Sequence, residues 1–370
     1  MEQMEKALVH FRTLLEEQFQ RLETLNKPRK DFSAMEKITI GVCDGDGIGP
    51  IIMAQATRVL HHLLQKDIAA GKVEIKPIEG LTIENRLEKN EAVPADVLSQ
   101  IKSCDVLLKG PTTTPNGGTM TSANVTLRRE LDLYANVRPV SIPEQGIDWM
   151  FYRENTEGEY VLGSRGIDLP GMAVDFKVTT DAGTKRIARA AFEYAKQNGK
   201  TRVTVVTKAN IMKKTDGKFS ALCKEIAAEY PGIETDEYYI DIMTANLVNE
   251  QIRNQFQVFV MPNLYGDIIT DEAAQIQGGV GTAGSANIGD QDAMFEAIHG
   301  SAPRMIEQGL GDYANPASIL KATAMLLRHI GRTEQAQKLE TALGTCPVKM
   351  TDGPDGPTAA QYTDALIAML

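Results

Sequence analysis

Two arginines and two polar side chains lie close together in residues 109–139. Ser122 and Asn124 end a polar loop, Arg128 falls in an expected helix, and Arg138 follows a short apolar run. The loop itself contains Thr112, Thr113, Thr114, Gly117 and Gly118. Arginine binds carboxylates through charge-assisted hydrogen bonds in a fork geometry, and glycine lets the backbone approach a ligand. The pattern indicates a site for a small molecule with several carboxylates, although a polar turn before an amphipathic helix would have the same composition.

Two carboxylates, Asp267 and Asp271, stand four residues apart at the start of an expected helix. This spacing places them on one helix face, where the helix dipole alone could favour them. Carboxylate oxygens also suit Mg²⁺ or Mn²⁺, and Asp241, at the start of another expected helix, is a third candidate ligand. The sequence contains no cluster of His or Cys that favours zinc.

Two further side chains are candidates for proton transfer. Lys208 directly follows a buried strand, and Tyr160 lies in a loop just after Arg153 and Glu154. A partly desolvated lysine has a lowered pKa and can serve in acid–base chemistry. Each residue also has an ordinary structural explanation, as a surface lysine or as a core tyrosine with a bonded hydroxyl.

The elements that position these residues alternate between strands and helices. Residues 38–64 predict a strand, a GDGIGP turn and a helix, which is typical of a parallel sheet. The turn lacks the spacing and the acidic partner of the dinucleotide-binding fingerprint, so it does not predict a Rossmann domain. Further strands are expected at 73–78, 104–109, 149–153, 174–180, 202–207, 237–240 and 258–261, with helices at 94–101, 184–198, 219–230, 241–254 and 317–330.

Bulk properties narrow the functional class. A length of 370 residues suggests two domains, and a net charge of −10 argues against a nucleic-acid partner. The cysteines show no metal-binding spacing, which favours free thiols in a reducing cytoplasm: Cys43, Cys104, Cys223 and Cys346. We expect no signal peptide and no membrane span.

Residues 1–26 predict an amphipathic helix, and residues 26–33 a linker. The apolar residues first follow heptad spacing and then fit a straight helix better, because Gln18 breaks the heptad: Met4, Leu8, Phe11, Leu15, Phe19 and Leu22. Such a stripe could pack on its own domain or pair subunits. The break at Gln18 favours packing on its own domain.

Eight motifs, in this order, give the chain a resemblance to a known family. They are GDGIGP, TSANVTLRRELDLYANVRP, YRENTEGEY, KANIMKKTDG, NLYGDIITDEAA, ANIGD, HGSAP and YANP, and they span residues 45–316. In this order they resemble the β-decarboxylating dehydrogenases, which include isocitrate, isopropylmalate, homoisocitrate and D-malate or tartrate dehydrogenases.

The resemblance implies a two-domain α/β fold that is not a Rossmann fold. Residues 35–133 and 279–370 would form a large cofactor-side domain. Residues 134–278 would form a small domain for dimerisation and metal binding, with an intersubunit strand clasp near 161–176. Residues 1–34 would add an N-terminal helix and linker, and this helix could join dimers into a larger assembly.

The resemblance also implies a reaction and the residues that perform it. Family members oxidise a 2-hydroxy acid at C2, transfer hydride to NAD or NADP, release CO₂ and protonate the resulting enolate, with a divalent metal as Lewis acid. The implied metal ligands are Asp241, Asp267 and Asp271. Lys208 would assist hydroxyl deprotonation, Tyr160 would protonate the enolate, and the carboxylates would bind Arg128, Arg138 and Arg153. Asp241 and Lys208 would come from the neighbouring subunit, so a homodimer would be the smallest active unit.

Substrate choice in this family depends on the polar loop. Ser122 and Asn124 offer a hydroxyl and an amide that suit a γ-carboxylate, which favours isocitrate. Homoisocitrate stays open because one methylene changes binding by only about 1–3 kcal/mol. A 3-isopropylmalate dehydrogenase also stays open, as does a noncatalytic regulatory subunit that binds isocitrate.

The cofactor is expected beside Thr113 and at the adenine-binding residues His299, Gly300 and Asn315. Arg304 stands where NAD-specific members carry an aspartate, and its charge would suit a 2′-phosphate. NADP is therefore favoured. NAD remains open because Met305 follows, where NADP enzymes of this type often have tyrosine.

Overall fold

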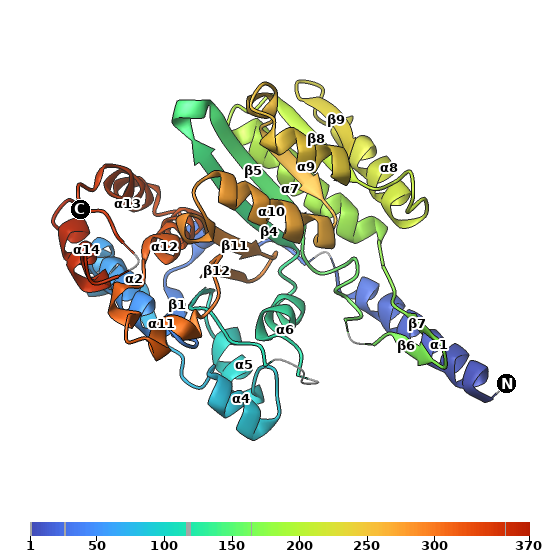
Figure 1. The fold of residues 1–370 in the computed structure, drawn as a ribbon, viewed down its shortest axis with the longest axis horizontal. Helices are drawn as coiled ribbons and strands as arrows, with labels where there is room; N and C mark the ends of the chain where they lie inside the picture. The colour runs from blue at the N-terminus through green and yellow to red at the C-terminus, as the bar shows by residue number, and fades with distance from the viewer. Residues whose placement is uncertain (1, 26, 116–119, 164, 352) are drawn as a thin grey trace. The chain divides into compact units, whose positions relative to one another are not determined.

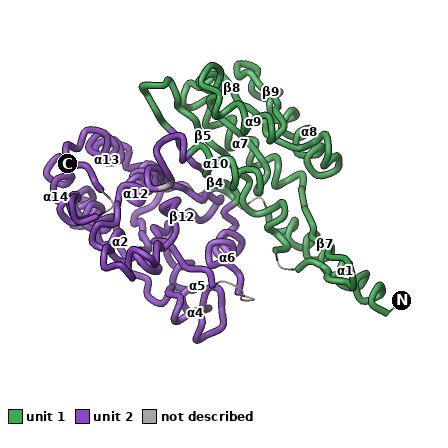
Figure 2. The backbone as a smooth tube through the Cα atoms, in the orientation of Figure 1, with its two compact units in different colours: residues 1–29, 134–136, 141–273 green, residues 30–133, 137–140, 274–370 purple. Residues whose placement is uncertain are grey.

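A computed structural model describes residues 2–25, 27–115, 120–163, 165–351 and 353–370, and these divide into two units (Figure 2). Unit 1 contains residues 1–29, 134–136 and 141–273, and unit 2 contains residues 30–133, 137–140 and 274–370. Residues 1–29 thus group with unit 1 instead of standing apart, and the later boundary falls after residue 273 instead of 278. Gly117 and Gly118 of the predicted binding loop lie outside the described residues.

The sheet of unit 2 contains three strands that are parallel to one another, β1 (Ile38–Cys43), β2 (Val73–Pro77) and β3 (Val106–Lys109). β12 (Ala293–Ala297) joins β3 in parallel, and β11 (Gly284–Ile288) pairs with β12 antiparallel. The resulting order is β2-β1-β3-β12-β11. β1 and β3 are almost entirely buried, which explains their nearly continuous apolar sequences.

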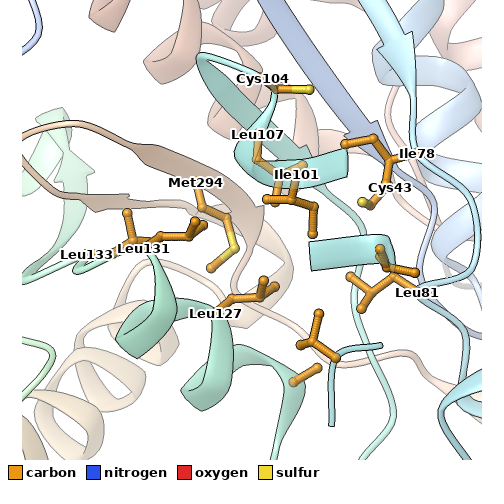
Figure 3. Packing of buried hydrophobic residues seen from close by; sticks show 13 residues of the cluster. Cys43, Ile78, Leu81, Ile101, Cys104, Leu107, Leu127, Leu131, Leu133 and Met294 are labelled. Atoms are coloured by element: carbon orange, nitrogen blue, oxygen red, sulfur yellow. The ribbon is translucent and has the colours of Figure 1, made fainter. Parts of the chain in front are cut away.

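Side chains from helices and strands of unit 2 pack into one apolar cluster (Figure 3). Ile101 of α5 (Ala95–Lys102) and Leu127 of α6 (Ala123–Glu130) pack with Leu107 of β3 and Met294 of β12. This packing fixes α6, which carries Arg128. The other helices of the unit are α2 (Gly49–Leu63), α3 (Gln65–Ala69), α4 (Ile83–Lys89), α11 (Pro303–Glu307), α12 (Ala317–His329), α13 (Thr333–Thr345) and α14 (Ala359–Ile367).

The sheet of unit 1 is parallel in the order β5-β10-β8-β9. These strands are β5 (Ile147–Glu154), β8 (Arg202–Thr207), β9 (Glu234–Tyr239) and β10 (Val258–Met261), with helices α7 (Asp181–Gln197), α8 (Thr215–Ala227), α9 (Ile240–Val248) and α10 (Asn263–Ile276). Its core contains Phe151 stacked on Phe259, with ring centroids 4.5 Å apart, and Trp149 against the edges of both. β4 (Ala135–Ile142) contributes residues to both units.

The strand predicted at 174–180 is wrong for most of its length. β7 (Met172–Val174) ends there, after pairing antiparallel with β6 (Ile167–Leu169). Its alternating side chains have separate partners instead of a sheet. Phe176 stacks on Phe11, Lys177 pairs with Asp216, and Thr180 caps α7.

The N-terminal helix α1 (Glu2–Glu23) packs on the rest of unit 1, where it lies beside β6 and β7 (Figure 1). Leu14, which is 1% exposed, lies on the packed face, and His10 Nε2 is 2.9 Å from the carbonyl of Arg165. Of the predicted apolar stripe, Phe11 contributes to the packing by stacking on Phe176, but most of the stripe lies on another face. Leu8, Leu15 and Phe19 remain exposed, Phe19 by 68%. The helix therefore packs on its own domain as predicted, but through a mixed polar face that apolar spacing does not reveal.

The four cysteines are free, as the sequence predicts, and all four are buried. Burial raises the pKa of Cys43 to about 12, so this thiol is not a nucleophile at neutral pH. Within the described ranges, no helix combines the length and hydropathy needed to cross a bilayer.

Candidate active site

Three predicted site residues meet in unit 1. Arg153, which is 1% exposed, is the last residue but one of β5 and donates through Nη1 to Asp267 Oδ1. The Tyr160 hydroxyl donates to the other oxygen, Oδ2, at 2.8 Å. The Tyr160 ring also lies against the guanidinium, with Cζ 5.3 Å from the ring centroid. The structure thus brings into contact the predicted carboxylate-binding cation, the predicted proton donor and a candidate metal ligand, which are up to 114 residues apart in sequence.

Asn263 at the start of α10 orients the guanidinium of Arg153. Its Oδ1 accepts from Nε at 3.0 Å and from Nη2 at 2.6 Å. β5 and β10 are parallel neighbours, so their carboxyl ends deliver Arg153 and Asn263 to the same edge of the sheet. Gly266 permits the close approach, because a Cβ there would lie 2.4 Å from Arg153 Cγ.

The predicted metal ligands Asp267 and Asp271 are both on α10. Asp267 and Asp271 lie one turn apart, and the helix begins at Asn263, so neither is in its first turn. The helix dipole therefore does not account for the presence of these two carboxylates at these positions. Their oxygens fit a hard divalent cation. Within the described residues of one chain, however, no group of three His, Cys, Asp or Glu side chains could hold a metal, so Asp241 does not complete this site in the same chain.

Lys208 and Asp241 form a separate pair at the carboxyl end of β8. Lys208 Nζ donates to Asp241 Oδ1, and this bond lowers the pKa of the Asp241 carboxyl. The main-chain N–H of Lys208 donates to Asp216 Oδ2 at 2.8 Å. Asp216 is fully buried, and Lys177 Nζ lies 2.6 Å from its other oxygen. This buried ion pair, which sequence reasoning missed, fixes the main chain that carries Lys208.

In unit 2 the GDGIGP turn supports the Thr113 loop. Asp46 Oδ2 accepts the N–H of Thr113 at 2.7 Å, and the Thr113 hydroxyl lies 2.7 Å from that of Ser301. Arg86 Nη1 donates to the Thr113 carbonyl at 2.7 Å. Gly47 has a φ of +59°, and a Cβ there would lie 2.0 Å from the Ser301 carbonyl oxygen. The turn therefore joins the loop to the HGSAP segment, and Asp46, Arg86 and Ser301 are site residues that sequence reasoning missed.

The polar substrate residues lie on α6 and β4. Ser122 is half-buried at the position before α6, and the Thr112 hydroxyl donates to Asn124 Oδ1 at 3.3 Å. Arg128 Nη2 is 3.4 Å from Glu296 Oε1, whereas its buried Nε has no partner among the described residues. Arg138, on β4, is 7% exposed. Arg128 thus keeps a buried donor that a ligand carboxylate could accept from.

Glu296 on β12 is the centre of a buried charge network that the sequence did not reveal. Lys109 Nζ lies 3.1 Å from Glu296 Oε2, and Asn287 Nδ2 donates to Oε1 at 2.9 Å. Burial alone would raise the pKa of Glu296, but the charges of Lys109 and Arg128 and the Asn287 hydrogen bond lower it to about 2. The network holds the Arg128 guanidinium through Nη2 and leaves its Nε for a ligand.

We expect Glu296→Gln to destabilise the protein by about 3–5 kcal/mol at neutral pH, because it leaves Lys109 buried without its counter-charge. The lowered pKa gives stability that is present above the ordinary value of 4.5 and is lost as pH falls towards about 2. The difference between variant and wild type should therefore shrink below pH 4.5. Urea unfolding at several pH values measures it. Glu74→Gln, which removes an exposed pair with Lys37, should change little, and equal effects of both substitutions would contradict the argument.

The predicted adenosine-binding residues flank the start of α11 and α12. His299 Nδ1 is 3.0 Å from the Gly300 carbonyl, and its buried Nε2 has no partner among the described residues. Burial lowers the pKa of His299. Arg304 is exposed on α11, and Asn315 Oδ1 accepts the N–H of Ala317 at 2.9 Å. A neutral imidazole and an exposed guanidinium suit an adenine and a phosphate respectively.

Comparison with known proteins shows which family the chain resembles. The family model described as isocitrate/isopropylmalate dehydrogenase matches residues 39–351. Subunit 2 of the mitochondrial NAD isocitrate dehydrogenase of Schizosaccharomyces pombe is 39% identical over 348 residues, covering 90% of this chain and 87% of its own. The NADP isocitrate dehydrogenase of Rickettsia prowazekii is 40% identical over 320 residues, covering 84% of this chain and 63% of its own.

A solved structure shows the same fold. The isocitrate dehydrogenase of Methylococcus capsulatus superposes with a TM-score of 0.78 at 35% identity, over 90% of this chain and 99% of its own. Since the family match covers most of the chain and includes every predicted site residue, the chain belongs to the isocitrate/isopropylmalate dehydrogenase family.

Proposed function

We propose that this protein catalyses the oxidative decarboxylation of isocitrate to 2-oxoglutarate with reduction of NAD or NADP. The observation that carries the proposal is the contact of Arg153 and Tyr160 with the two oxygens of Asp267. In this proposal, the guanidinium would bind a substrate carboxylate and the hydroxyl would give up a proton beside the same candidate metal ligand. The relatives described above, named as isocitrate dehydrogenases, support the reaction class.

The side chains divide the chemistry between them. Arg128, Arg138 and Arg153 bind the carboxylates and orient C2 towards the nicotinamide beside Thr113. Lys208 accepts the hydroxyl proton as hydride leaves, and Tyr160 returns a proton to the enolate carbon after CO₂ has left. Asp241, Asp267 and Asp271 would hold Mg²⁺ or Mn²⁺, which supplies Lewis-acid stabilisation when it is bound.

The site is shared between two subunits of a homodimer. In one chain Lys208 pairs with Asp241, whereas Tyr160 and Arg153 contact Asp267. No group of three metal-binding side chains forms within the described residues. A twofold dimer that brings the partner subunit's Asp241 and the partner subunit's Lys208 to Asp267 would complete both the cation site and the proton-transfer pair.

Isocitrate is preferred to its relatives because the substrate loop is polar. Ser122 and Asn124 present a hydroxyl and an amide on a helix start that is packed against the core. An apolar alkyl group would leave both groups unpaired, which a site built for hydrogen bonds penalises strongly. Homoisocitrate differs by one methylene and remains the nearest competing substrate.

NADP is the favoured cofactor, because Arg304 is exposed on α11 beside the adenosine residues. Its guanidinium could bind a 2′-phosphate in fork geometry. The two relatives described above use NAD in one case and NADP in the other, so they do not decide between the cofactors.

A substrate–cofactor matrix tests the proposal. Purified protein with Mg²⁺ or Mn²⁺ is given isocitrate, homoisocitrate, 3-isopropylmalate or D-malate with each cofactor, and reduced cofactor is followed by absorbance. We expect turnover of isocitrate with NADP, and a preference for NAD would contradict only the role of Arg304. Turnover of isopropylmalate alone would contradict the role given to the polar loop. Isocitrate binding without turnover would instead indicate a noncatalytic regulatory subunit.

We also propose that dimers associate into a larger assembly through the exposed apolar stripe of α1. Leu8, Leu15 and Phe19 are exposed on the face opposite the one that packs on unit 1. Substituting Leu8 and Phe19 by glutamine should reduce the mass in solution to that of a dimer. An unchanged mass would exclude this role of the stripe.

The two-stranded sheet of β6 and β7 has open edges that could pair as a clasp between the two subunits of the dimer.

Cytoplasmic localisation remains a prediction from the free thiols. The fission yeast relative is named as mitochondrial, which describes that protein. Fractionation of the source cells tests the prediction.

A further inference from the structure

The N-terminal helix α1 delivers an arginine to the loop that carries Tyr160. Arg21 Nη2 lies 2.6 Å from Glu157 Oε1, and the two side chains are 18% and 3% exposed. Arg21 Nε also donates to Gln18 Oε1 at 3.1 Å, which holds the guanidinium against its own helix. α1 precedes residue 39, where the family match begins, so this contact adds a support from outside the matched residues.

The loop contains two buried carboxylates, Glu154 and Glu157, whose mutual repulsion must be compensated by nearby positive charge. Glu154 accepts the N–H of Thr156 at 2.9 Å and that of Glu157 at 2.6 Å. Burial and then the charge of Glu157 raise the pKa of Glu154 to about 7. Glu157 accepts from both the N–H of Thr180, at 2.9 Å, and the Thr180 hydroxyl, and Arg21 adds a full charge to these neutral donors, while the charge of Arg186 acts on Glu154. Without the charge of Arg21, the repulsion between the two carboxylates would be less compensated.

Glu157 is connected directly to the site. Its carbonyl accepts from Asn263 Nδ2 at 3.2 Å, and the same Asn263 orients Arg153. The next residue, Gly158, exchanges hydrogen bonds of 2.8 and 3.1 Å with Val178. Tyr160 follows two residues later, so a shift of Glu157 would displace both the Arg153 support and the segment that presents the Tyr160 hydroxyl.

We propose that Arg21 is a positioning residue of the active site, which holds Glu157 so that Asn263, Arg153 and Tyr160 keep their reactive geometry. The inference rests on the proposed function, because it assigns Arg21 an effect on the steps performed by Arg153 and Tyr160. The helix has its own attachments, since Phe11 stacks on Phe176 at 5.1 Å and Arg165 Nη2 donates to Glu17 Oε1 at 2.8 Å. Loss of the Arg21 side chain therefore leaves α1 attached to unit 1.

Steady-state kinetics of three variants in the full-length protein test the proposal. Arg21→Ala should lower kcat by about tenfold to a hundredfold and raise the KM for isocitrate, because small misplacement of reacting groups is costly. Arg21→Lys keeps the charge and should recover part of the loss. The matched control is Arg12→Ala, which removes the same side chain from the exposed face of the same helix and should leave kcat and KM unchanged. Unchanged kcat in Arg21→Ala would overturn the proposal.

A double-mutant cycle separates positioning from general destabilisation. Arg21→Ala and Glu157→Gln should be non-additive in kcat, because each removes the same ion pair, whereas independent structural losses would add. Fully additive losses would overturn the proposal.

Hydrogen exchange provides a readout that does not depend on turnover. The amides of residues 154–160 should exchange faster in Arg21→Ala than in Arg12→Ala or wild type, and equal rates would overturn the proposal. If the wild type turned over no substrate, the proposed function would fail, while the exchange result would still decide whether Arg21 holds the loop.

Discussion

Asp267→Asn is expected to lower kcat/KM for isocitrate by about a thousandfold, because loss of a ligand to a Lewis-acid cation removes several kcal/mol of transition-state stabilisation. The substitution also removes the negative charge that faces Arg153 and leaves one acceptor oxygen instead of two for Arg153 and Tyr160. Binding of Mn²⁺, followed by the electron paramagnetic resonance signal of the free ion in the presence of isocitrate, should weaken in parallel. This second readout links the lost activity to the cation.

The control for this prediction is another aspartate in the same unit. Asp181 is exposed at the start of α7 and pairs with Lys218. Asp181→Asn should leave both Mn²⁺ binding and kcat unchanged. If Asp267→Asn bound Mn²⁺ as tightly as wild type and kept its activity, Asp267 would not be a metal ligand, and its role would be limited to its hydrogen bonds with Arg153 and Tyr160.

The strands that the sequence predicted best are short segments rich in apolar and β-branched residues. β1, β8 and β10 have this composition because parallel strands are buried on both faces. β11 and β12 were missed, since they carry the buried polar side chains Ser285, Asn287 and Glu296. Asn287 and Glu296 belong to the charge network beside Arg128, and these polar side chains interrupt the apolar pattern that identifies a strand.

The sequence predicted those site residues whose own side-chain chemistry suggests a role. It did not predict residues that act only through a contact with another residue. Arg153, Tyr160 and Asp267 were identified from their motifs, and the structure brings them into contact. No local pattern could connect Arg21 to Glu157, because they are 136 residues apart and neither spacing nor composition records a tertiary ion pair. The docking face of α1 was misjudged for the same reason. It is defined by partners such as Phe176 and Arg165, which lie more than a hundred residues away.

Mixing two inactive variants is expected to restore activity if the active site is shared between subunits. Tyr160→Phe removes the group that protonates the enolate, and Lys208→Met removes the group that accepts the hydroxyl proton. Each alone should lower kcat by about 10²–10⁴-fold, the usual contribution of a general acid or base. In a dimer with one chain of each kind, one site would contain both substitutions, and the other would combine an unchanged Tyr160 with the partner subunit's unchanged Lys208.

Random reassociation of equal amounts makes half of the dimers mixed, so about one quarter of all sites should be intact and activity should return to about one quarter of wild type. The two variants are mixed in mild denaturant, returned to native buffer and assayed with isocitrate, and unmixed samples treated in the same way serve as controls. A site built within one chain would show no recovery, because every chain then carries one defect. Since no group of three metal-binding side chains forms within the described residues of one chain, this experiment also decides where Asp241 acts. Recovery would place it, with its hydrogen-bond partner Lys208, opposite the Asp267 of the other subunit.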